Sequence, residues 1–448
     1  MAWLAAAAVA AAVAVGEVHR RPSNSVAAVA AVATALVMVA CQLPSHATVA
    51  RHCPTPLSHA TVTPPSYATV PRHRPVPRRC RTPLSHATVP RYRPKPPSRP
   101  TPLSHPPSPQ VDKLVTPLHF LSNAPPHIFD GAKPLAVVGI GGDATPIGLD
   151  CPHADLTQVG SWGKDYEGAW IRWALYKSGG VMTFSLADPA LTTTHLQGLA
   201  ELVGNPMDPL PQAPVLPPAR AGAPRFHEDF KRVMVVERRA VKPARVFGDV
   251  WHTDGHFFAR PPHFTMQRAV AVTPNGTNPT QFASAMHAFR RLPQAFKLAL
   301  QRMTQVHSAF LAFSPLWTTW SAADGDERKI DRKGWERDVH HPLVAAHPYG
   351  DVQSLYVATP AECPSIVNST TNEVVAGWED LVRQLERLIT APSNVFNVTH
   401  HPNKVILYDN RLVMHRAVAE DWSVPRSLER ILSLDDDGVP PMATREPT

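Results

Sequence analysis

One short stretch, residues 251–257 (Trp-His-Thr-Asp-Gly-His-Phe), constrains the fold more than any other part of the chain. His252 and Asp254 are two residues apart, and side chains two apart on an extended strand point to the same face. The pair therefore offers two ligands of a metal site, and a third must come from elsewhere. We expect the third ligand to be His415, so only a fold that returns the distant C-terminal part of the chain to this point can complete the site.

Two histidines and one carboxylate that leave one side of an ion open are typical of non-haem Fe(II) sites. His415 is the last residue of the motif Asp-Asn-Arg-x-x-x-His at residues 409–415. A single histidine is more often a hydrogen-bonded core or surface residue, and it is the joint pattern that favours a metal site. The neighbouring His256 and His263 are interpreted as supporting or structural residues rather than ligands.

From about Lys133 onward the chain resembles the taurine dioxygenase (TauD/TfdA) family of Fe(II)/2-oxoglutarate-dependent dioxygenases. Trp-His-Thr-Asp, Asp-Asn-Arg-x-x-x-His and a later pair of arginines carry the resemblance, all in the family's order. The resemblance implies that His252, Asp254 and His415 bind Fe(II), with 2-oxoglutarate and O2 as cosubstrates. The implied reaction is hydroxylation of a small organic molecule, with release of succinate and CO2.

The resemblance also implies roles for three further residues. Arg426 is at the family's position for binding the distal carboxylate of 2-oxoglutarate, which a guanidinium binds bidentately. Thr280 is where the family has a threonine that contacts the cosubstrate, although the preceding residues differ from the family's Gly-Gly-Asp run. Arg430 is where taurine-type enzymes bind the substrate's anionic group, which predicts an acidic or sulfonated substrate. Met207 is near the position of a substrate-binding histidine, and this departure argues against taurine itself.

Many short strands with helices at the margins predict an α+β, mainly β fold. We expect a double-stranded β-helix, a cupin-like jelly roll with flanking helices, whose mouth can hold a small ligand. The spacing predicts helices over residues 166–177, 191–203, 281–305 (interrupted at Pro293) and 378–389. The expected strands are residues 135–140, 180–185, 233–237, 263–272, 355–358, 404–408 and 412–417. The resemblance implies that residues 313–340 cover the active site as a lid.

The N-terminal part differs in composition from the rest. Residues 1–41 are Ala/Val-rich and are interpreted as low-complexity sequence or a targeting segment, and neither apolar run reaches the length of a membrane span. Residues 42–110 are Pro-rich and repetitive, which predicts disorder. Residues 111–440 form the predicted dioxygenase domain. A cytoplasmic location is slightly favoured, organelle targeting stays open, and the oligomeric state is undetermined, with a homo-oligomer compatible.

The basic charge is confined to the N-terminal part. Residues 1–110 contain 12 Lys and Arg residues but one acidic residue, Glu17, although the whole chain has a formal net charge of +8. The remainder is slightly acidic, so we expect a small-molecule substrate and no nucleic acid as partner. The five cysteines include no Cys-x-x-Cys pair, which predicts neither a disulfide framework nor a thiolate zinc site.

Two other functions remain open on the sequence alone. A non-redox, cupin-type metal enzyme would keep the barrel and the metal, and it would not need Arg426 to bind 2-oxoglutarate. A non-catalytic scaffold would act through the Pro-rich residues 42–110.

Overall fold

The computed structural model describes residues 121, 123–139, 145–185, 192–208, 225–238, 248–272, 278–314, 338–349, 352–418 and 425–435. The predictions for residues 1–41 and 42–110 lie outside the described residues, as does most of the predicted lid. The domain boundaries 111–440 stay a prediction.

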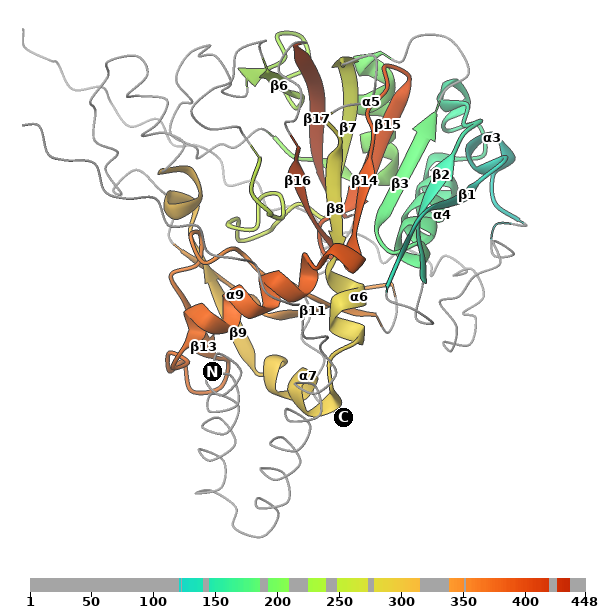
Figure 1. The fold of residues 1–448 in the computed structure, drawn as a ribbon. Helices are drawn as coiled ribbons and strands as arrows, with labels where there is room; N and C mark the ends of the chain where they lie inside the picture. Colours follow the sequence, from blue (N-terminus) through green and yellow to red (C-terminus); the bar gives the residue numbers. More distant parts are fainter. Residues whose placement is uncertain are drawn as a thin grey trace, which may run out of the picture. The chain divides into compact units, whose positions relative to one another are not determined.

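The largest sheet in the described part of the chain has nine strands. Their order is β1-β2-β3-β15-β7-β17-β6-β5, with β4 also paired to β17 (Figure 1). All neighbours are antiparallel except β2 and β3. The strands are β1 Lys133–Val138, β2 Thr145–Cys151, β3 Val181–Ser185, β4 Asn205–Pro206, β5 Arg225–Phe226, β6 Met234–Arg238, β7 Phe264–Ala271, β15 Lys404–Asp409 and β17 Arg426–Leu434.

The central strands of this sheet use both faces. Met266 and Leu407 pack in one core cluster with residues of helices α4 (Lys164–Lys177) and α5 (Thr193–Val203). Tyr408, the next residue after Leu407, belongs to a different cluster on the opposite face. This alternation is the period-two pattern of a strand buried on both sides.

A second, smaller sheet covers the opposite face. It has the order β14-β8-β16, with β14 at Val395–Val398, β8 at Thr280–Ser284 and β16 at Val413–Ala417. Phe282 of β8 packs on Tyr408 of the large sheet, with ring centroids 5.1 Å apart. The two sheets therefore form a sandwich, with the helices α4 and α5 on its outer side.

A third core forms around helix α9 (Trp378–Ile389), whose apolar residues recur at helical spacing. It packs with short strands and helices that Figure 1 shows beyond the small sheet. These are β9 Met303–His307, β10 Val339–Pro342, β11 Val344–Ala346, β12 Gln353–Leu355, β13 Ser365–Asn368, α6 Ala285–Arg290 and α7 Gln294–Leu300. The remaining short helices are α3 Pro126–Phe129, η3 Leu156–Gln158 and η5 Pro392–Asn394.

Most predicted elements are present, with two corrections. The helix predicted over residues 281–305 is wrong at both ends, because residues 281–284 belong to strand β8 and residues 303–305 to strand β9. Between them α6 and α7 are separate helices, and Pro293 is the N-cap of α7. The strand predicted over residues 355–358 is also displaced, since β12 ends at Leu355. In both places pairing with distant strands decided a local ambiguity.

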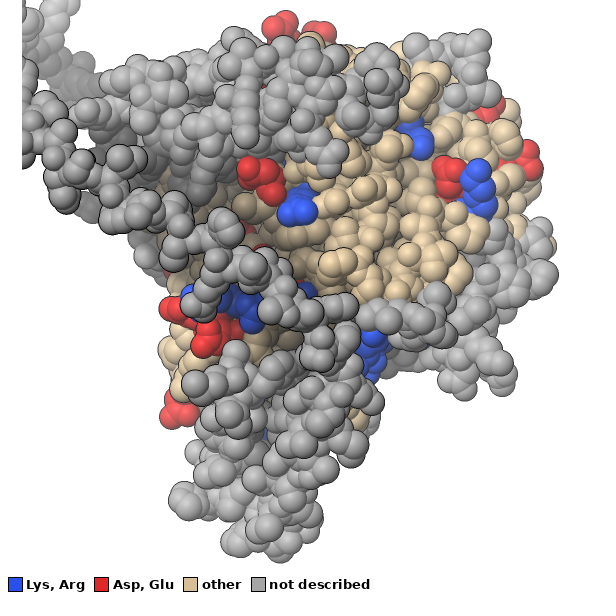
Figure 2. Space-filling model, in the orientation of Figure 1, with Lys and Arg blue, Asp and Glu red and all other residues tan. Residues whose placement is uncertain are grey.

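The described surface carries both acidic and basic side chains. In the view of Figure 2, acidic and basic side chains are interspersed on the described surface. No helix among the described residues is long and apolar enough to cross a membrane. Cys151 and Cys363 are buried and unpaired.

Candidate metal centre

His252 and His415 are directly opposite each other on paired backbone segments. The amide of His252 donates to the carbonyl of His415 at 3.0 Å, and the amide of His415 donates back at 2.9 Å. Residues opposite each other in such a bridge have neighbouring side chains, and the two imidazole centroids are 4.2 Å apart. His415, which is distant in the sequence, thus lies beside the Trp-His-Thr-Asp motif because it is part of strand β16.

Asp254 completes a group of three side chains. Its Oδ1 is 3.7 Å from Nε2 of His252, and its Oδ2 is 3.7 Å from Nε2 of His415. One potential ligand atom from each residue lies within 4.8 Å of the others. We expected an extended strand at residues 252–254. The structure has a single bridge residue at His252 followed by a turn, in which Gly255 has a φ of +61°. The predicted same-side arrangement of His252 and Asp254 is nevertheless present.

The protonation states suit a metal ion. Nδ1 of His252 donates to the carbonyl of Val250 at 2.8 Å, so a neutral ring presents a bare Nε2 toward Asp254. Burial and then His252 lower the pKa of His415 to about 3, which keeps this ring neutral. Burial alone would raise the pKa of Asp254, but Arg430 and the two histidines hold it well below its usual range. Two imidazoles and a carboxylate are a donor set that fits Fe(II).

The carboxylate of Asp254 is held from the large sheet by three side chains. Arg430 donates to Oδ1 at 2.7 Å, whereas Thr265 and Tyr408 both donate to Oδ2 at 2.8 Å. Sequence reasoning missed Thr265 and Tyr408. The available signal was a polar residue at alternate positions of a predicted strand that is otherwise apolar.

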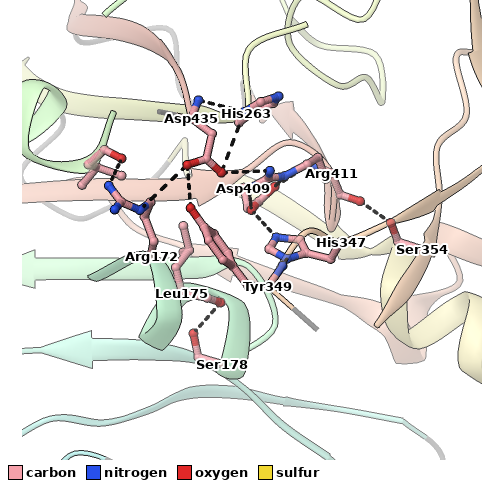
Figure 3. A network of polar contacts seen from close by, with 11 residues as sticks. Arg172, Leu175, Ser178, His263, His347, Tyr349, Ser354, Asp409, Arg411 and Asp435 are labelled. Atoms are coloured by element: carbon pink, nitrogen blue, oxygen red, sulfur yellow. Dashed lines mark hydrogen bonds and ion pairs between the residues drawn. The ribbon is translucent and has the colours of Figure 1, made fainter. Parts of the chain in front are cut away.

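The Asp-Asn-Arg motif forms the turn between β15 and β16. Figure 3 shows the carboxylate of Asp409 between Arg411 and His347. Arg411 donates from Nη2 to Oδ2 of Asp409 at 2.6 Å and from Nη1 to Asp435 at 3.2 Å. Tyr349 donates to the other oxygen of Asp435 at 2.5 Å. This network ties the turn that leads to His415 to the end of β17.

The network is ionised although it is buried. Burial would raise the pKa of Asp409, but the guanidinium of Arg411 and then His347 hold it well below its usual range. Such a pair is stable only when its remaining hydrogen bonds are satisfied. The backbone amide and the side chain of Arg411 both donate to Asp409.

Of the two residues predicted to bind 2-oxoglutarate, Thr280 begins strand β8 of the small sheet and Arg426 begins strand β17 of the large sheet. Thr280 is opposite Ala417, two residues after His415 on β16, and its hydroxyl is 2.8 Å from Nε2 of His400. Arg426 donates to the carbonyl of Asn278 at 2.8 Å. His400 was not predicted. Burial and then Arg426 lower its pKa well below the usual value.

Arg430, which was predicted to bind the substrate's anionic group, is bound to Asp254 in the structure. Its guanidinium is buried against Asp254, and it also contacts the sulfur of Met234 at 3.2 Å. Met207 directly follows β4, and its amide donates to the carbonyl of Leu432 on β17.

His256 and His263 point away from the three ligands. His256 contacts Glu362 at 3.1 Å and His307 at 2.9 Å. Nδ1 of His263 accepts a hydrogen bond from the amide of Asp435 at 2.8 Å. Within the described residues, the group that could hold a metal ion is His252, Asp254 and His415.

Comparisons with known proteins point to one family. The profile described as "Taurine catabolism dioxygenase TauD, TfdA family" matches residues 141–432. An alpha-ketoglutarate-dependent sulfonate dioxygenase of Saccharomyces cerevisiae is 30% identical over 209 residues, 45% of each chain. An alpha-ketoglutarate-dependent 2,4-dichlorophenoxyacetate dioxygenase of Cupriavidus pinatubonensis is 26% identical over 187 residues, 42% of this chain and 60% of the relative.

A crystal structure of a taurine dioxygenase from Burkholderia xenovorans aligns with a TM-score of 0.48 and 24% identity, covering 68% of this chain and 89% of the other. The chain spans only about half the length of the curated relatives it matches. The profile match covers more than half of this chain and includes His252, Asp254 and His415. The chain therefore belongs to the TauD/TfdA family.

Proposed function

We propose that the protein is an Fe(II)- and 2-oxoglutarate-dependent dioxygenase that hydroxylates a small organic substrate and releases succinate and CO2. The observation that carries the proposal is that a backbone bridge and the turn after it bring His252 and Asp254 to His415 of the small sheet, with an imidazole nitrogen and an ionised carboxylate facing one point. Family membership supports the same chemistry. The two packed sheets are the halves of the jelly-roll barrel expected for such an enzyme.

His252, Asp254 and His415 are the proposed ligands of the iron. When bound, Fe(II) would activate O2 at the expense of 2-oxoglutarate, and this supplies the oxidising power that removes hydrogen from a substrate carbon. The protein holds the imidazole of His415 neutral, because burial disfavours its charged form. It also keeps the carboxylate of Asp254 ionised beside Arg430, so these two groups bind metal without first losing protons.

Arg426 and Thr280 are the proposed contacts of 2-oxoglutarate. Arg426 is buried and already holds the backbone at Asn278, two residues before Thr280. Thr280 is paired with β16, so a bound dicarboxylate would extend from the guanidinium toward the metal ligands. Charge-assisted bidentate contacts make arginine well suited to such a carboxylate.

Arg430 is the proposed contact of an anionic substrate group. One of its N–H groups is bound to Asp254, and a guanidinium carries five N–H donors in a planar fork. Its guanidinium is held against Asp254, so it carries a positive charge beside the proposed metal centre, where an anionic group would be attracted. The named substrates of the relatives, a sulfonate and 2,4-dichlorophenoxyacetate, are acids of this kind.

Succinate release tests the proposal. Purified protein is incubated with Fe(II), 2-oxoglutarate and O2 together with a panel of sulfonates, sulfate esters, aryloxyacids and amino acids. We expect succinate to rise above the uncoupled background for at least one class and to depend on all three additions. Absence of both Fe(II) binding and succinate formation across the panel would overturn the assignment.

Arg426→Ala separates this function from a non-redox metal enzyme on the same barrel. We expect the variant to lose 2-oxoglutarate binding, measured by titration calorimetry on the Mn(II)-loaded protein, by at least about 100-fold, since a buried charged contact is removed. The matched control is Arg383→Ala, because Arg383 is an exposed residue of α9 that pairs with Glu379 and Asp380. Equal 2-oxoglutarate affinity in both variants would favour the non-redox alternative.

A further inference from the structure

The register of the large sheet places four polar side chains on the face that contacts Asp254. Tyr408 of β15 is directly opposite Thr265 of β7, and Arg430 of β17 is directly opposite Gln267 of the same strand. Thr265 and Gln267 are two residues apart, so both pairs project from one face. This face is opposite the one on which Met266 and Leu407 meet the helices. We call these four residues the carboxylate floor.

Each hydroxyl of the carboxylate floor is oriented by an amide. Gln267 donates to the phenol oxygen of Tyr408 at 3.0 Å, which directs the phenol proton to Oδ2 of Asp254. Asn410 donates to the hydroxyl of Thr265 at 2.9 Å, which directs that proton to the same Oδ2.

The lone pairs of Asp254 can then be counted. An ionised carboxylate has about four acceptor positions. Thr265 and Tyr408 occupy Oδ2, and Arg430 occupies one position on Oδ1. One position remains, on Oδ1, the atom that faces His252.

Tyr408 is also next to the third ligand. Its hydroxyl oxygen is 3.1 Å from Nε2 of His415, and the two ring centroids are 4.7 Å apart. A single buried hydroxyl therefore touches Asp254, which follows the bridge at His252, and His415 of the small sheet.

We propose that Tyr408 is a positioning residue of the metal centre, which through its hydroxyl fixes Asp254 as a one-oxygen ligand and sets its distance from His415. The inference rests on the proposed function, because it assumes that these side chains bind a metal. Residues that hydrogen-bond to ligands orient them, and their loss weakens metal binding by about 10- to 100-fold.

Tyr408→Phe tests this role, because it removes the hydroxyl and keeps the ring that packs on Phe282. The probe is Co(II), with affinity measured by titration and coordination by its visible ligand-field absorption. We expect about 10- to 100-fold weaker Co(II) binding. We also expect a changed absorption spectrum, because the freed position on Oδ2 permits a second oxygen contact to the ion.

The matched control is Tyr356→Phe. Tyr356 is also a buried tyrosine, but its hydroxyl has no hydrogen-bond partner among the described residues. We expect this variant to bind Co(II) with wild-type affinity and spectrum. A purely structural effect of losing a buried hydroxyl would change the melting temperature of the metal-free protein without changing the spectrum of bound Co(II).

The outcomes separate the two proposals. If the wild-type protein binds no Co(II), the proposed function fails. If it binds Co(II) and Tyr408→Phe gives the same affinity and spectrum, only the role of Tyr408 is overturned. Should Tyr408→Phe fail to fold, Gln267→Leu decides, since it removes the donor that orients the phenol. Several-fold weaker Co(II) binding supports the inference, and unchanged binding overturns it.

Discussion

At the scale of the residue, the buried His263 is expected to make the free energy of unfolding depend on pH. His263 is buried beside Asp409, Arg411 and Asp435. Burial and then Arg411 lower its pKa from 6.5 to about 4. Its Nδ1 accepts a backbone hydrogen bond from Asp435, which protonation of that atom would remove.

The direction of the pH effect follows from proton binding. Between about pH 6.5 and pH 4 the unfolded chain binds a proton at this histidine and the folded chain does not, so stability falls as the pH is lowered. We expect His263→Asn to reduce the slope of unfolding free energy against pH by up to about 1.4 kcal/mol per pH unit in this window. Urea unfolding at several pH values measures the slope.

Asparagine is chosen because its side-chain oxygen can accept the same backbone hydrogen bond. The same substitution at the exposed His153 is the matched control. An unaltered slope in His263→Asn, with the wild-type midpoint at neutral pH, would show that His263 does not contribute.

At the scale of elements, two glycines in neighbouring helices have opposite roles. Gly168 of α4 is in close contact with the end of α5, and a Cβ built there would be 2.1 Å from the carbonyl oxygen of Leu202. Gly198 is within α5, and a Cβ there would meet nothing within 4 Å. The same substitution is therefore a steric clash in one helix and a gain of helix propensity in the other.

We expect Gly168→Ala to destabilise the protein by about 1–3 kcal/mol, because α4 must move away from a rigid backbone atom. We expect Gly198→Ala to stabilise it by about 0.5–1 kcal/mol, since alanine loses less entropy on forming a helix. Chemical denaturation of both variants measures the difference. Equal effects of the same sign would contradict the packing of α4 on α5.

At the scale of the whole molecule, the proposed metal joins segments that are distant in the sequence. His252 forms a backbone bridge with His415 and Asp254 follows it in the chain before β7, whereas His415 is on the small sheet. An ion bound only in the folded state stabilises it by mass action, by about 2.7 kcal/mol at a free concentration 100 times its dissociation constant.

We therefore expect Mn(II) to raise the melting temperature relative to the protein in EDTA. His252→Ala should abolish the increase, whereas substitution of the exposed His340 by alanine should retain it. Calorimetric scans with and without Mn(II) measure both. A full increase in His252→Ala would place the stabilising ion elsewhere.

The sequence by itself determined the local features. His252 and Asp254 are two residues apart, which put them on the same side even though the expected strand is a bridge and a turn. Helix α9 agrees with its prediction because apolar residues at helical spacing are a local signal. The family, too, was identified from motifs that are contiguous in the chain, and this prediction is confirmed.

Only the tertiary structure decided what surrounds Asp254. The register that pairs Tyr408 with Thr265, and Arg430 with Gln267, joins strands from distant parts of the chain. Pairing with β16 in the small sheet also made residues 281–284 part of a strand, although the local pattern favoured a helix there. Periodicity reports which side of an element is apolar, but the partner and register of a strand depend on long-range packing. The three proposed ligands could therefore be predicted from the chain, whereas the contacts of the hydroxyls and the guanidinium with Asp254 could not.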